Sequence, residues 1–402
     1  METSLFQISL RTTVTSGSGS RSLLPATVHG LGGRRAVLFT DKGLTKAGIT
    51  EKITELFHTM PTGVQLVGVF DDIEQDAKAS IINKAVRYYK ECGGDSLIAL
   101  GGGSVLDTVK GIKWMLSKGL TDIRQGLLGN VIEMWPRAQY IPIPHVAIPT
   151  TAGTGAEVSP IAVIFHDEAK VKMNIINPFV NADIALLDAD LTVGLPAAIT
   201  AFTGFDALTH AVEGYFSPQN NPVADAFSLQ STRMITENLP RAVENGRDLA
   251  ARANMLVASS MAISTFSLTL NAIPVHNMAH AFGAKFGIPH GLANAVLLPY
   301  VMRALPDFYK PRIHGFAEAL GLKEASTDSA ECLEQVVQQL EALREEVGLQ
   351  STFSDFEMAP ELLRKMVEFV HADPSGVVFR LPDAVIQHVT RQVAAAPAGA
   401  VR

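Results

Sequence analysis

The chain has only two cysteines, Cys92 and Cys332, among its 402 residues. Two cysteines cannot build a disulfide framework or a zinc site made of thiolates. This excludes a small disulfide-stapled protein and a cysteine-ligated zinc enzyme. So few thiols are also in keeping with a reducing compartment, and we therefore expect a cytoplasmic protein.

Charged residues are scarce as well, at 18% of the chain, whereas hydrophobic residues make up 47%. This composition excludes a disordered protein and predicts a large buried core. Acidic residues outnumber basic ones by 40 to 33, so the formal net charge is −7. Without a basic run the chain has no electrostatic reason to bind nucleic acid or an anionic membrane, and we expect neither partner.

Segments that enter or cross a membrane are not indicated. The first residues lack a basic region followed by an apolar run, so we expect no signal peptide. Residues 253–275 contain no Asp, Glu, Lys, Arg or His and are long enough to span a bilayer. Their many Ser, Thr and Asn residues favour a helix buried inside a helical domain instead.

The two halves of the sequence differ in hydrophobic period. Strands are predicted at residues 35–40, 64–70, 96–100 and 146–149, with amphipathic helices such as 45–58 and 77–92 between them. This alternation predicts a parallel sheet with helices on both faces. The apolar runs 161–166 and 171–176 flank a short polar turn and predict a hairpin added to that sheet.

After Leu195-Pro196 the strand signal ends, and helical patterns continue almost to the C-terminus. We therefore expect an α/β domain over residues 1–190 and an all-α domain over residues 191–402. Because no Gly/Ser linker separates the two, we expect them to be tightly apposed, with a ligand site in the crevice between them.

A run of glycines, Gly101-Gly102-Gly103-Ser104, stands between a predicted strand and a predicted helix. Glycines let backbone N–H groups approach a phosphate closely, and the N-terminus of the helix adds a favourable dipole. The loop therefore predicts a site for a pyrophosphate, with Asp107 in the first turn of the helix. A tight turn without a ligand is the alternative.

Two further segments follow predicted strands. Asp41 comes after the strand at 35–40, where a carboxylate can accept hydrogen bonds from a ribose and repel a 2′-phosphate, which favours NAD over NADP. The alternative for Asp41 is an N-cap of the next helix. The loop 149–157 (PTTAGTGAE) offers three threonine hydroxyls to phosphate, ribose or amide groups, or is simply a capped loop.

The helical half contains a carboxylate and several histidines at helical spacing. Asp206 and His210 are four residues apart, His276 and His280 repeat that spacing, and His290 follows in a Pro-His-Gly segment. Residues four apart share one face of a helix. A carboxylate with imidazoles suits Fe(II), Zn(II) or Mn(II). The spacing leaves open whether His276 and His280 both bind the metal or one of them faces the reacting centre.

These segments, in their order and spacing, resemble the iron-containing (group III) alcohol dehydrogenases from about residue 35 to residue 302. The resemblance is carried by the glycine loop with Asp107, the 149–157 loop, residues 204–215 (GFDALTHAVEGY) and residues 276–290. It implies a dinucleotide-binding α/β domain with a parallel sheet followed by an all-helical domain. Dehydroquinate synthase has a comparable architecture.

The resemblance also implies roles for individual residues. The metal ligands would be Asp206, His210, His276 and His290, and His280 would be the non-ligand, catalytic histidine near the nicotinamide. The residues of the cofactor site would be Gly102, Gly103, Ser104 and Asp107 around the pyrophosphate, Thr150, Thr151 and Lys172 on the nicotinamide-ribose side, and Asp41 at the adenosine ribose. The implied cofactors are NAD and Fe²⁺, with Zn²⁺ or Mn²⁺ as alternatives, and the implied assembly is a homodimer or larger homo-oligomer.

The chain departs from the family pattern in two places. The family commonly carries an Asn-Pro pair after the second strand, where this chain has residues 71–76 (DDIEQD). An Asn-Pro-Arg ending is common near the C-terminus, where this chain has residues 373–380 (DPSGVVFR). Neither departure touches the proposed ligands, but both bear on the subgroup and hence on the substrate.

We therefore predict a metal-dependent oxidoreductase that interconverts a small alcohol and its aldehyde or ketone by hydride transfer to and from NAD(H). A dehydrogenase with a Tyr-x-x-x-Lys pair is excluded, because no tyrosine has a lysine four residues later. One alternative is a metal-dependent lyase of the dehydroquinate synthase type, but residues 200–215 and 276–290 offer only Lys285 to a phosphorylated substrate. A metal-stabilised helical binding protein is the other alternative, and it leaves the glycine loop without a use.

Overall fold

The structure is a computed structural model that describes residues 6–60, 62–269, 272–376 and 378–394. These residues fall into two compact units, one of residues 8–194 and one of residues 195–394 together with residues 6 and 7. The division after Gly194 lies close to the predicted domain boundary after residue 190.

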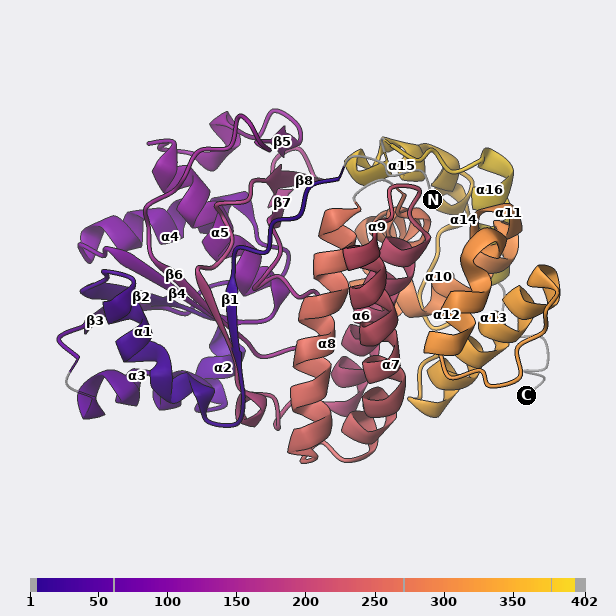
Figure 1. Cartoon of the computed structure of the whole chain (residues 1–402). Helices are drawn as coiled ribbons and strands as arrows, with labels where there is room; N and C mark the ends of the chain where they lie inside the picture. The colour runs from indigo at the N-terminus through magenta and orange to yellow at the C-terminus, as the bar shows by residue number, and fades with distance from the viewer. Residues whose placement is uncertain (1–5, 61, 270–271, 377, 395–402) are drawn as a thin grey trace. The chain divides into compact units, whose positions relative to one another are not determined.

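Six of the strands described in the first unit form one parallel sheet in the order β1-β9-β6-β4-β2-β3 (Figure 1). Their bounds are β1 Thr13–Ser16, β2 Arg35–Phe39, β3 Gln65–Phe70, β4 Ser96–Gly101, β6 His145–Pro149 and β9 Ile184–Leu187. The predicted parallel sheet is thus confirmed, with β2, β3, β4 and β6 at the predicted places.

Helices cover both faces of this sheet. They are α1 Leu24–Gly30, α2 Lys42–Lys46, α3 Ile49–Thr59, α4 Ala79–Glu91 and α5 Gly103–Ser117, with short 3₁₀ turns at Ser20–Leu23, Ile123–Gln125 and Ala189–Leu191. Along β2, Leu38 joins the core under α1 and α3, whereas Val37 joins the core under α4 and α5, as alternation along a strand requires. The predicted helix over 45–58 is divided into α2 and α3 because Gly48 adopts a left-handed conformation with φ 71°.

The predicted hairpin exists, but it does not extend the main sheet. Strands β7 Ile161–His166 and β8 Val171–Ile176 pair antiparallel and join β5 Val131–Ile132 in a separate three-stranded sheet among the described residues. The expectation that the hairpin adds to the parallel sheet is therefore wrong. Both flanks of β6 are taken by β4 and β9, and β1 continues the sheet beyond β9.

The first unit also buries charge. Lys110 Nζ donates to the carbonyl of Ile161 at 2.5 Å, and Lys113 Nζ donates to the carbonyl of Asn181 at 2.9 Å. His145 lies fully buried in β6, and burial together with the two lysine charges lowers its pKa well below the usual value. His145 is therefore neutral at neutral pH.

The described residues of the second unit form helices and no strand, which confirms the predicted all-α part. The longer helices are α6 Ala197–Phe216, α7 Pro222–Glu244, α8 Leu249–Leu268, α9 Pro274–Phe286, α10 His290–Ala304, α13 Ser329–Glu346 and α16 Asp383–Ala394. The shorter ones are α11 Pro306–Tyr309, α12 Ile313–Ala319, α14 Pro360–Leu363 and α15 Met366–Ala372, with 3₁₀ turns η4 Lys310–Arg312 and η5 Pro374–Gly376. Helices α6, α7 and α8 pack along one another, and α10 packs against α6, α9, α13 and α16 (Figure 1).

Polar residues fix where several of these helices begin. Asn221 precedes α7, and its side chain accepts a hydrogen bond from the N–H of Ala224 at 3.0 Å. Asp248 precedes α8 and accepts from the N–H of Ala251 at 2.9 Å. Such caps satisfy N–H groups that have no partner within the helix, so the first turns form at defined residues.

The uncharged stretch 253–275 lies largely in α8, which packs against both α6 and α7. Its polar side chains bond to the helix backbone one turn earlier, as Ser264 does to the carbonyl of Ser260 at 2.7 Å and Ser260 to that of Leu256 at 3.1 Å. Among the described residues, no helix combines the length and the apolar character that a membrane crossing needs.

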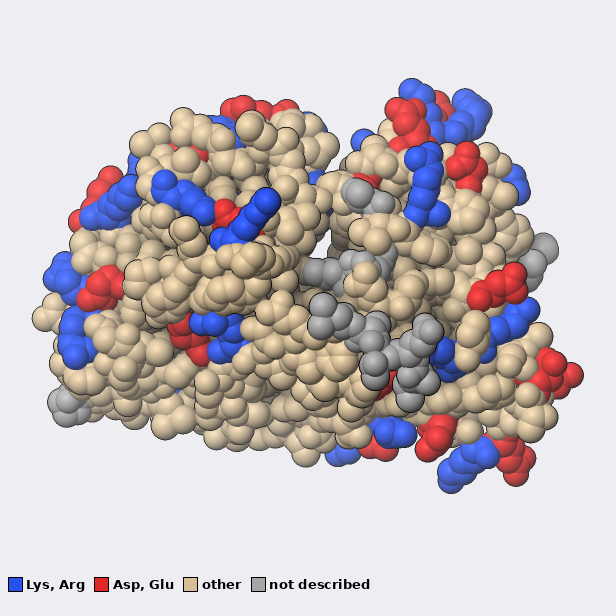
Figure 2. Space-filling view, turned by 45° about the horizontal axis from the view of Figure 1, so that its top comes forward, with Lys and Arg blue, Asp and Glu red and all other residues tan. Residues whose placement is uncertain are grey.

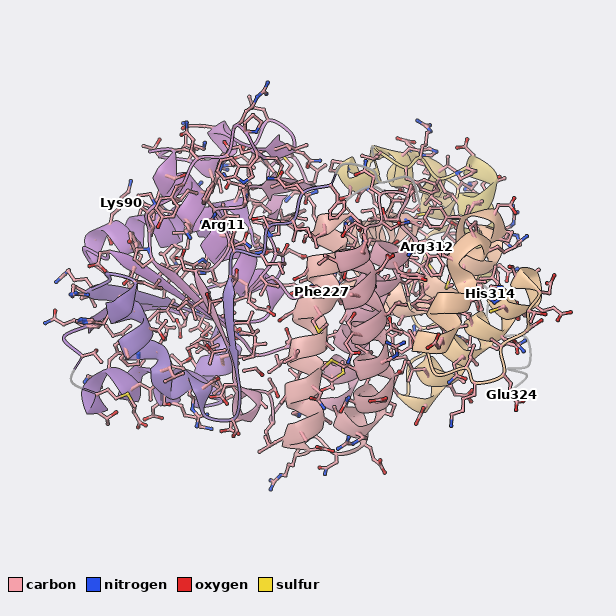
Figure 3. The ribbon with its side chains drawn as sticks, in the orientation of Figure 1. Arg11, Lys90, Phe227, Arg312, His314 and Glu324 are labelled. Carbon is pink, nitrogen blue, oxygen red and sulfur yellow. The ribbon has the colours of Figure 1, made fainter. Side chains whose placement is uncertain are left out.

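Arg312, labelled in Figure 3, connects η4 to α7 and α6. Its Nη2 lies 2.5 Å from Asp225 Oδ2 on α7, and its guanidinium lies 4.0 Å from the centre of the Tyr215 ring on α6.

On the face shown in Figure 2, basic and acidic side chains are interspersed on a largely uncharged surface.

Candidate functional site

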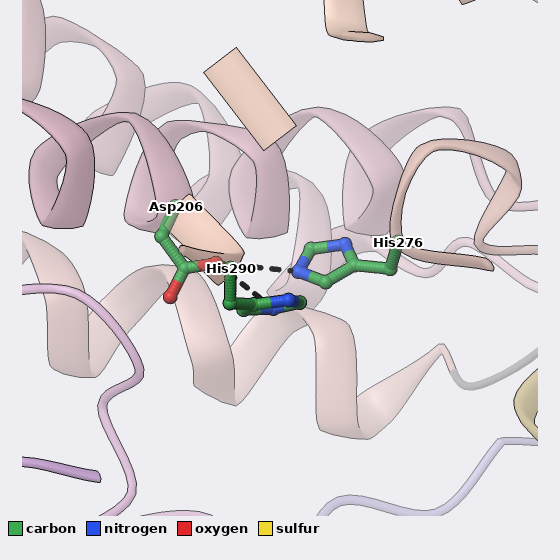
Figure 4. Close-up of side chains that lie close together, drawn as sticks. All are labelled: Asp206, His276 and His290. Carbon is green, nitrogen blue, oxygen red and sulfur yellow. Dashed lines mark ion pairs between the residues drawn. The ribbon is translucent and has the colours of Figure 1, made fainter. Parts of the chain in front are cut away.

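Three of the predicted metal ligands meet in the second unit, although they come from three different helices. One donor atom from each of Asp206 on α6, His276 on α9 and His290 at the start of α10 lies within 4.8 Å of the other two (Figure 4). Asp206 Oδ1 is 3.5 Å from His276 Nε2 and 3.4 Å from His290 Nε2. The cluster thus joins segments that are 70 to 84 residues apart in sequence, from 206 to 276 and to 290.

The other two histidines of the predicted constellation stand beside these ligands. The His210 ring stacks on that of His276, with ring centroids 4.5 Å apart and an interplanar angle of 19°. The His280 ring stacks on that of His290 at 5.2 Å. All five residues are therefore brought together, while the roles of His210 as a ligand and of His280 as a non-ligand stay predictions.

The charge state of Asp206 suits a cation. Its side chain is only 4% exposed, and burial alone would raise its pKa. The imidazoles of His210, His290 and His276 outweigh that effect and hold the pKa of Asp206 below its ordinary value. A buried carboxylate flanked by imidazoles, without a thiolate, fits Fe²⁺, Zn²⁺ or Mn²⁺, and Asp206 with the Nε2 atoms of His276 and His290 would hold the ion.

Glu213 orients His276, one of the predicted ligands, and was missed in the sequence. It is buried on α6 and contacts His276 Nδ1 through Oε2, while its Oε1 accepts from the N–H of Val275 at 2.6 Å and of His276 at 3.3 Å. Burial opposes protonation of His276, yet Glu213 and Asp206 raise its pKa to about 9. Because a carboxylate accepts only, it keeps a proton on Nδ1, and a metal ion held by Nε2 would take the place of the second proton.

Asn294 supports the carboxylate of Asp206 and was also missed. Its Nδ2 donates to Asp206 Oδ1 at 2.7 Å. Asn294 lies one helical turn after His290 on α10, and Glu213 lies two turns after Asp206 on α6. The helical spacing that places the predicted ligands on shared helix faces would therefore have pointed to both of these residues as well.

Gly291 explains the glycine of the Pro-His-Gly segment. A Cβ atom added there would lie 2.3 Å from the carbonyl oxygen of Phe202 on α6. The first turn of α10 therefore rests directly on the backbone of α6, and a larger residue would push apart the helices that carry His290 and Asp206.

In the first unit, most of the predicted cofactor residues follow strands of the parallel sheet, whereas Lys172 lies within β8 of the smaller sheet. From β2 the chain continues to β3 on one side, and β4 then returns to pair with β2 on its other side. Such a reversal makes a topological switch point, where open parallel sheets bind ligands beyond the carboxyl ends of the strands. Asp41 follows β2 and Gly102 follows β4 at this point.

The glycine loop and the threonine loop lie against each other. The N–H of Thr150 donates to the carbonyl of Gly101 at 3.1 Å. A Cβ on Gly102 would lie 3.3 Å from Thr151 Oγ1, and a Cβ on Gly103 would lie 2.8 Å from Thr154 Cγ2. The glycines are therefore needed for close packing of the two loops at the N-terminus of α5.

Two of the predicted cofactor residues have partners that give them structural roles. Asp41 accepts a hydrogen bond from the N–H of Leu44 at 3.0 Å, which is the N-cap alternative. Asp107 accepts from the N–H of Val163 at 3.1 Å and pairs with Lys110 at 3.0 Å, so both of its oxygens bond within the unit. These contacts give Asp107 a structural role, while its part in cofactor binding stays a prediction.

Ser104 and Lys172 are connected through one residue. Ser104 Oγ accepts from the N–H of Asp76 at 3.1 Å, and Lys172 Nζ lies 3.0 Å from Asp76 Oδ1. Asp76 itself adopts a positive φ of 74°. Residues 71–76, where the sequence differs from the family pattern, therefore link β8 to the glycine loop.

Comparison with known proteins assigns the family. The profile described as "Iron-containing alcohol dehydrogenase" matches residues 11–189, and "Fe-containing alcohol dehydrogenase family, C-terminal" matches residues 200–378. The chain is 36% identical over 327 residues to 1,3-propanediol dehydrogenase of Klebsiella pneumoniae, covering 81% of this chain and 82% of that protein. It is 32% identical over 347 residues to NAD-dependent methanol dehydrogenase of Bacillus methanolicus, covering 86% and 88%.

A crystal structure of 1,3-propanediol oxidoreductase superposes with a TM-score of 0.88 at 31% identity, over 97% of this chain and all of that one. These relatives are named as alcohol oxidoreductases, which supports the predicted dehydrogenase and not the lyase alternative. With both profiles matched in sequence order and the histidine cluster assembled, the chain belongs to the iron-containing alcohol dehydrogenase family and is an oxidoreductase.

Proposed function

We propose that this oxidoreductase transfers a hydride between a small primary alcohol or diol and NAD, with one divalent metal ion in the helical unit. The observation that carries the proposal is the buried cluster of Asp206, His276 and His290, whose donor atoms lie within 4.8 Å of one another. Burying these groups together without a cation would be costly, because a carboxylate and imidazoles are all strongly hydrated in water.

For the metal we propose Fe²⁺, with Zn²⁺ or Mn²⁺ as alternatives, held by Asp206, His210, His276 and His290. When bound, such an ion supplies Lewis acidity that polarises the oxygen of an alcohol or carbonyl substrate. Glu213 keeps the proton of His276 on Nδ1, and Asn294 holds the Asp206 carboxylate in place.

For the cofactor we propose NAD, whose nicotinamide accepts the hydride. The backbone N–H groups at the start of α5 bind its pyrophosphate, and the proposed contact residues are Gly102, Gly103, Ser104, Thr150, Thr151, Lys172 and Asp41. The close packing of the glycine and threonine loops at a topological switch point supports this site. The name of the methanol dehydrogenase relative supports NAD as the acceptor.

For substrate and proton transfer we propose a short alcohol and His280. The relatives named for 1,3-propanediol and methanol support a short primary alcohol or diol. As the alcohol loses its carbon-bound hydride to the nicotinamide, its hydroxyl proton has to leave as well. His280 stacks on His290 and therefore stands beside the proposed ligands, where it can receive that proton.

The test is reconstitution of metal-free protein with Fe²⁺, Zn²⁺ or Mn²⁺ in turn, followed by a panel of alcohols and aldehydes with NAD and NADP in parallel. We expect NADH to form, as followed by its near-ultraviolet absorbance, and we expect His276→Ala and His290→Ala to lose both metal and turnover. His314→Ala is the matched control, because His314 is an exposed histidine of the same unit that bonds Ser329 at 3.1 Å. The proposal would be refuted if no compound of the panel gave NADH formation or consumption. It would also be refuted if His276→Ala and His290→Ala both kept full metal content and turnover.

The assembly and the location stay predictions. We propose a homodimer or larger homo-oligomer, which light scattering of the purified protein would test. A cytoplasmic location is in keeping with Cys92 and Cys332, both of which are free thiols, and cell fractionation would test it.

A further inference from the structure

The C-terminal segment that departs from the family pattern contacts the active-site histidine. Asp373, which follows α15, places Oδ2 at 2.9 Å from Nδ1 of His280 on α9. The side chain of Asp373 is 9% exposed and that of His280 is 15% exposed. A nearly buried carboxylate and imidazole thus form a pair beside the proposed metal ligands.

Several contacts hold this carboxylate over α9. The N–H of Ser375 donates to Asp373 Oδ1 at 2.7 Å, which leaves Oδ2 for the histidine. Asn277, one turn before His280, donates through Nδ2 to the carbonyl of Val370 at 3.1 Å. A Cβ on Gly376 would lie 2.7 Å from Asn277 Nδ2, so only a glycine lets the turn lie this close to α9.

We propose that Asp373 is a positioning residue that fixes His280 in the tautomer with its proton on Nδ1. A carboxylate is an acceptor only, so the nitrogen that faces it must carry the hydrogen. Ser375 Oγ also lies near this nitrogen, but at 3.4 Å it is the more distant partner. Burial would raise the pKa of Asp373, whereas His280 and Ser375 hold it below the ordinary value, so Asp373 is an acceptor at neutral pH.

This tautomer leaves the lone pair of His280 on Nε2, and its use rests on the proposed function. In that reaction the alcohol O–H bond breaks and its proton goes to Nε2, while the C–H bond breaks and its hydride goes to NAD. The products are the carbonyl compound, NADH and an imidazolium whose charge Asp373 balances. The opposite tautomer has no lone pair on Nε2 and cannot take the proton.

The substitution Asp373→Asn tests the assignment sharply. The N–H of Ser375 needs an acceptor, so the amide oxygen should stay at the Oδ1 position and the amide NH₂ should face His280 Nδ1. Nδ1 then has to accept, and the proton moves to Nε2. Nuclear magnetic resonance of ¹⁵N-histidine-labelled, zinc-loaded protein separates the two forms, because protonated and unprotonated ring nitrogens differ widely in ¹⁵N shift. His280→Gln assigns the signals.

The expected result is a protonated Nδ1 on His280 in the unsubstituted protein and a protonated Nε2 in Asp373→Asn. We also expect kcat to fall on the order of 100-fold, the lower range for loss of a proton-transfer group. Metal content and the KM values for alcohol and NAD should change little. The matched control is Asp383→Asn, because the exposed Asp383 makes an equivalent contact of 2.7 Å with His371. Its loss should leave both the His280 tautomer and kcat unchanged.

A proton on Nε2 of His280 in the unsubstituted protein would overturn the inference, as would an unchanged tautomer with full kcat in Asp373→Asn. Asp373→Ala provides a second variant, and its melting temperature separates misfolding from loss of the pair. If the unsubstituted protein oxidises no alcohol, the proposed function fails. The tautomer measurement then still decides whether Asp373 positions His280.

Discussion

His276 and His280 stand one turn apart on α9, with ring centroids 6.2 Å apart and planes inclined at 69°, and each turns Nδ1 toward a carboxylate that is buried or nearly so. For His276 that carboxylate is Glu213 on α6, and for His280 it is Asp373 after α15. In each pair the proton stays on Nδ1, so Nε2 is the nitrogen whose lone pair is available. One helix face thus presents two imidazoles of the same tautomer, one proposed for metal binding and the other for proton transfer.

The partner of His276 leads to the first prediction. In Glu213→Gln the amide oxygen should remain on the N–H groups of Val275 and His276, so the amide NH₂ faces His276 Nδ1. The ring proton then moves to Nε2 and competes with the metal, and metal affinity should fall about 10- to 100-fold. Competition with a chromophoric chelator measures the affinity. Glu237→Gln, an exposed change on α7, is the control, and equal affinities for the two variants would contradict the role.

Removal of the metal should destabilise the helical unit. An ion that binds only the folded protein adds about 2.7 kcal/mol to the free energy of unfolding at a free concentration 100 times its Kd. A chelator should therefore lower the melting temperature, and added Zn²⁺ should restore it. Asp206→Asn should abolish the difference, because the anionic ligand is gone. A metal-dependent shift that persists in Asp206→Asn would place the ion elsewhere.

Asp41 allows its two roles to be separated. Asp41→Ser keeps an N-cap on α2 but removes the charge that would repel a 2′-phosphate. A pair of like charges about 4 Å apart in water costs about 1 kcal/mol, so the ratio of kcat/KM for NADP to that for NAD should rise roughly fivefold.

Asp41→Ala should raise that ratio equally, and it should also destabilise the first unit by about 0.5–2 kcal/mol through loss of the cap. An unchanged cofactor ratio in both variants would leave Asp41 with its capping role alone.

His145 predicts how the stability of the first unit depends on pH. Its pKa in the folded protein lies well below 6.5, so as the pH falls through 6.5 the unfolded chain takes up a proton that the folded chain does not. The contribution of neutral His145 to the free energy of unfolding is therefore fully present above pH 6.5. It decreases below that pH, by up to about 1.4 kcal/mol per pH unit. Denaturant unfolding from pH 7.5 to 5 should show this slope, and it should be reduced in His145→Gln. His58→Gln, at an exposed histidine, should keep it.

Much of the fold followed from the sequence because period alone separates strands from helices. The parallel sheet and the helical part were both predicted, and β2, β3, β4 and β6 appear at the predicted places. The placement of the hairpin was wrong, since hydrophobic alternation identifies a strand but not its neighbour. β1 and β9 pair over a separation of about 170 residues, as Thr13 does with Ile184, and no local pattern encodes that contact.

Part of the candidate site could likewise be predicted from the sequence, and part of it could not. Helical spacing indicated a carboxylate–imidazole site but left open which of His276 and His280 would bind, and the family resemblance supplied the set that includes Asp206, His276 and His290, which the packed helices bring together. The roles of Glu213 and Asp373 depend on contacts across 63 and 93 residues, which only the packed helices reveal. The departing segment 373–380 was noted in the sequence, but its contact with His280 was not, because spacing does not say where a turn after α15 will lie.

The contact between Gly291 and the carbonyl of Phe202 has a consequence for changing this enzyme. At this contact the distance between α6, which carries Asp206, and α10, which carries His290, depends on the absence of a Cβ atom. Glycine has only a hydrogen atom at the position where every other residue has a carbon. Mutational libraries that spare all donor atoms but vary Gly291 should therefore yield proteins with a complete set of ligands that no longer converge. Redesign of the site should therefore leave this contact between α6 and α10 unchanged.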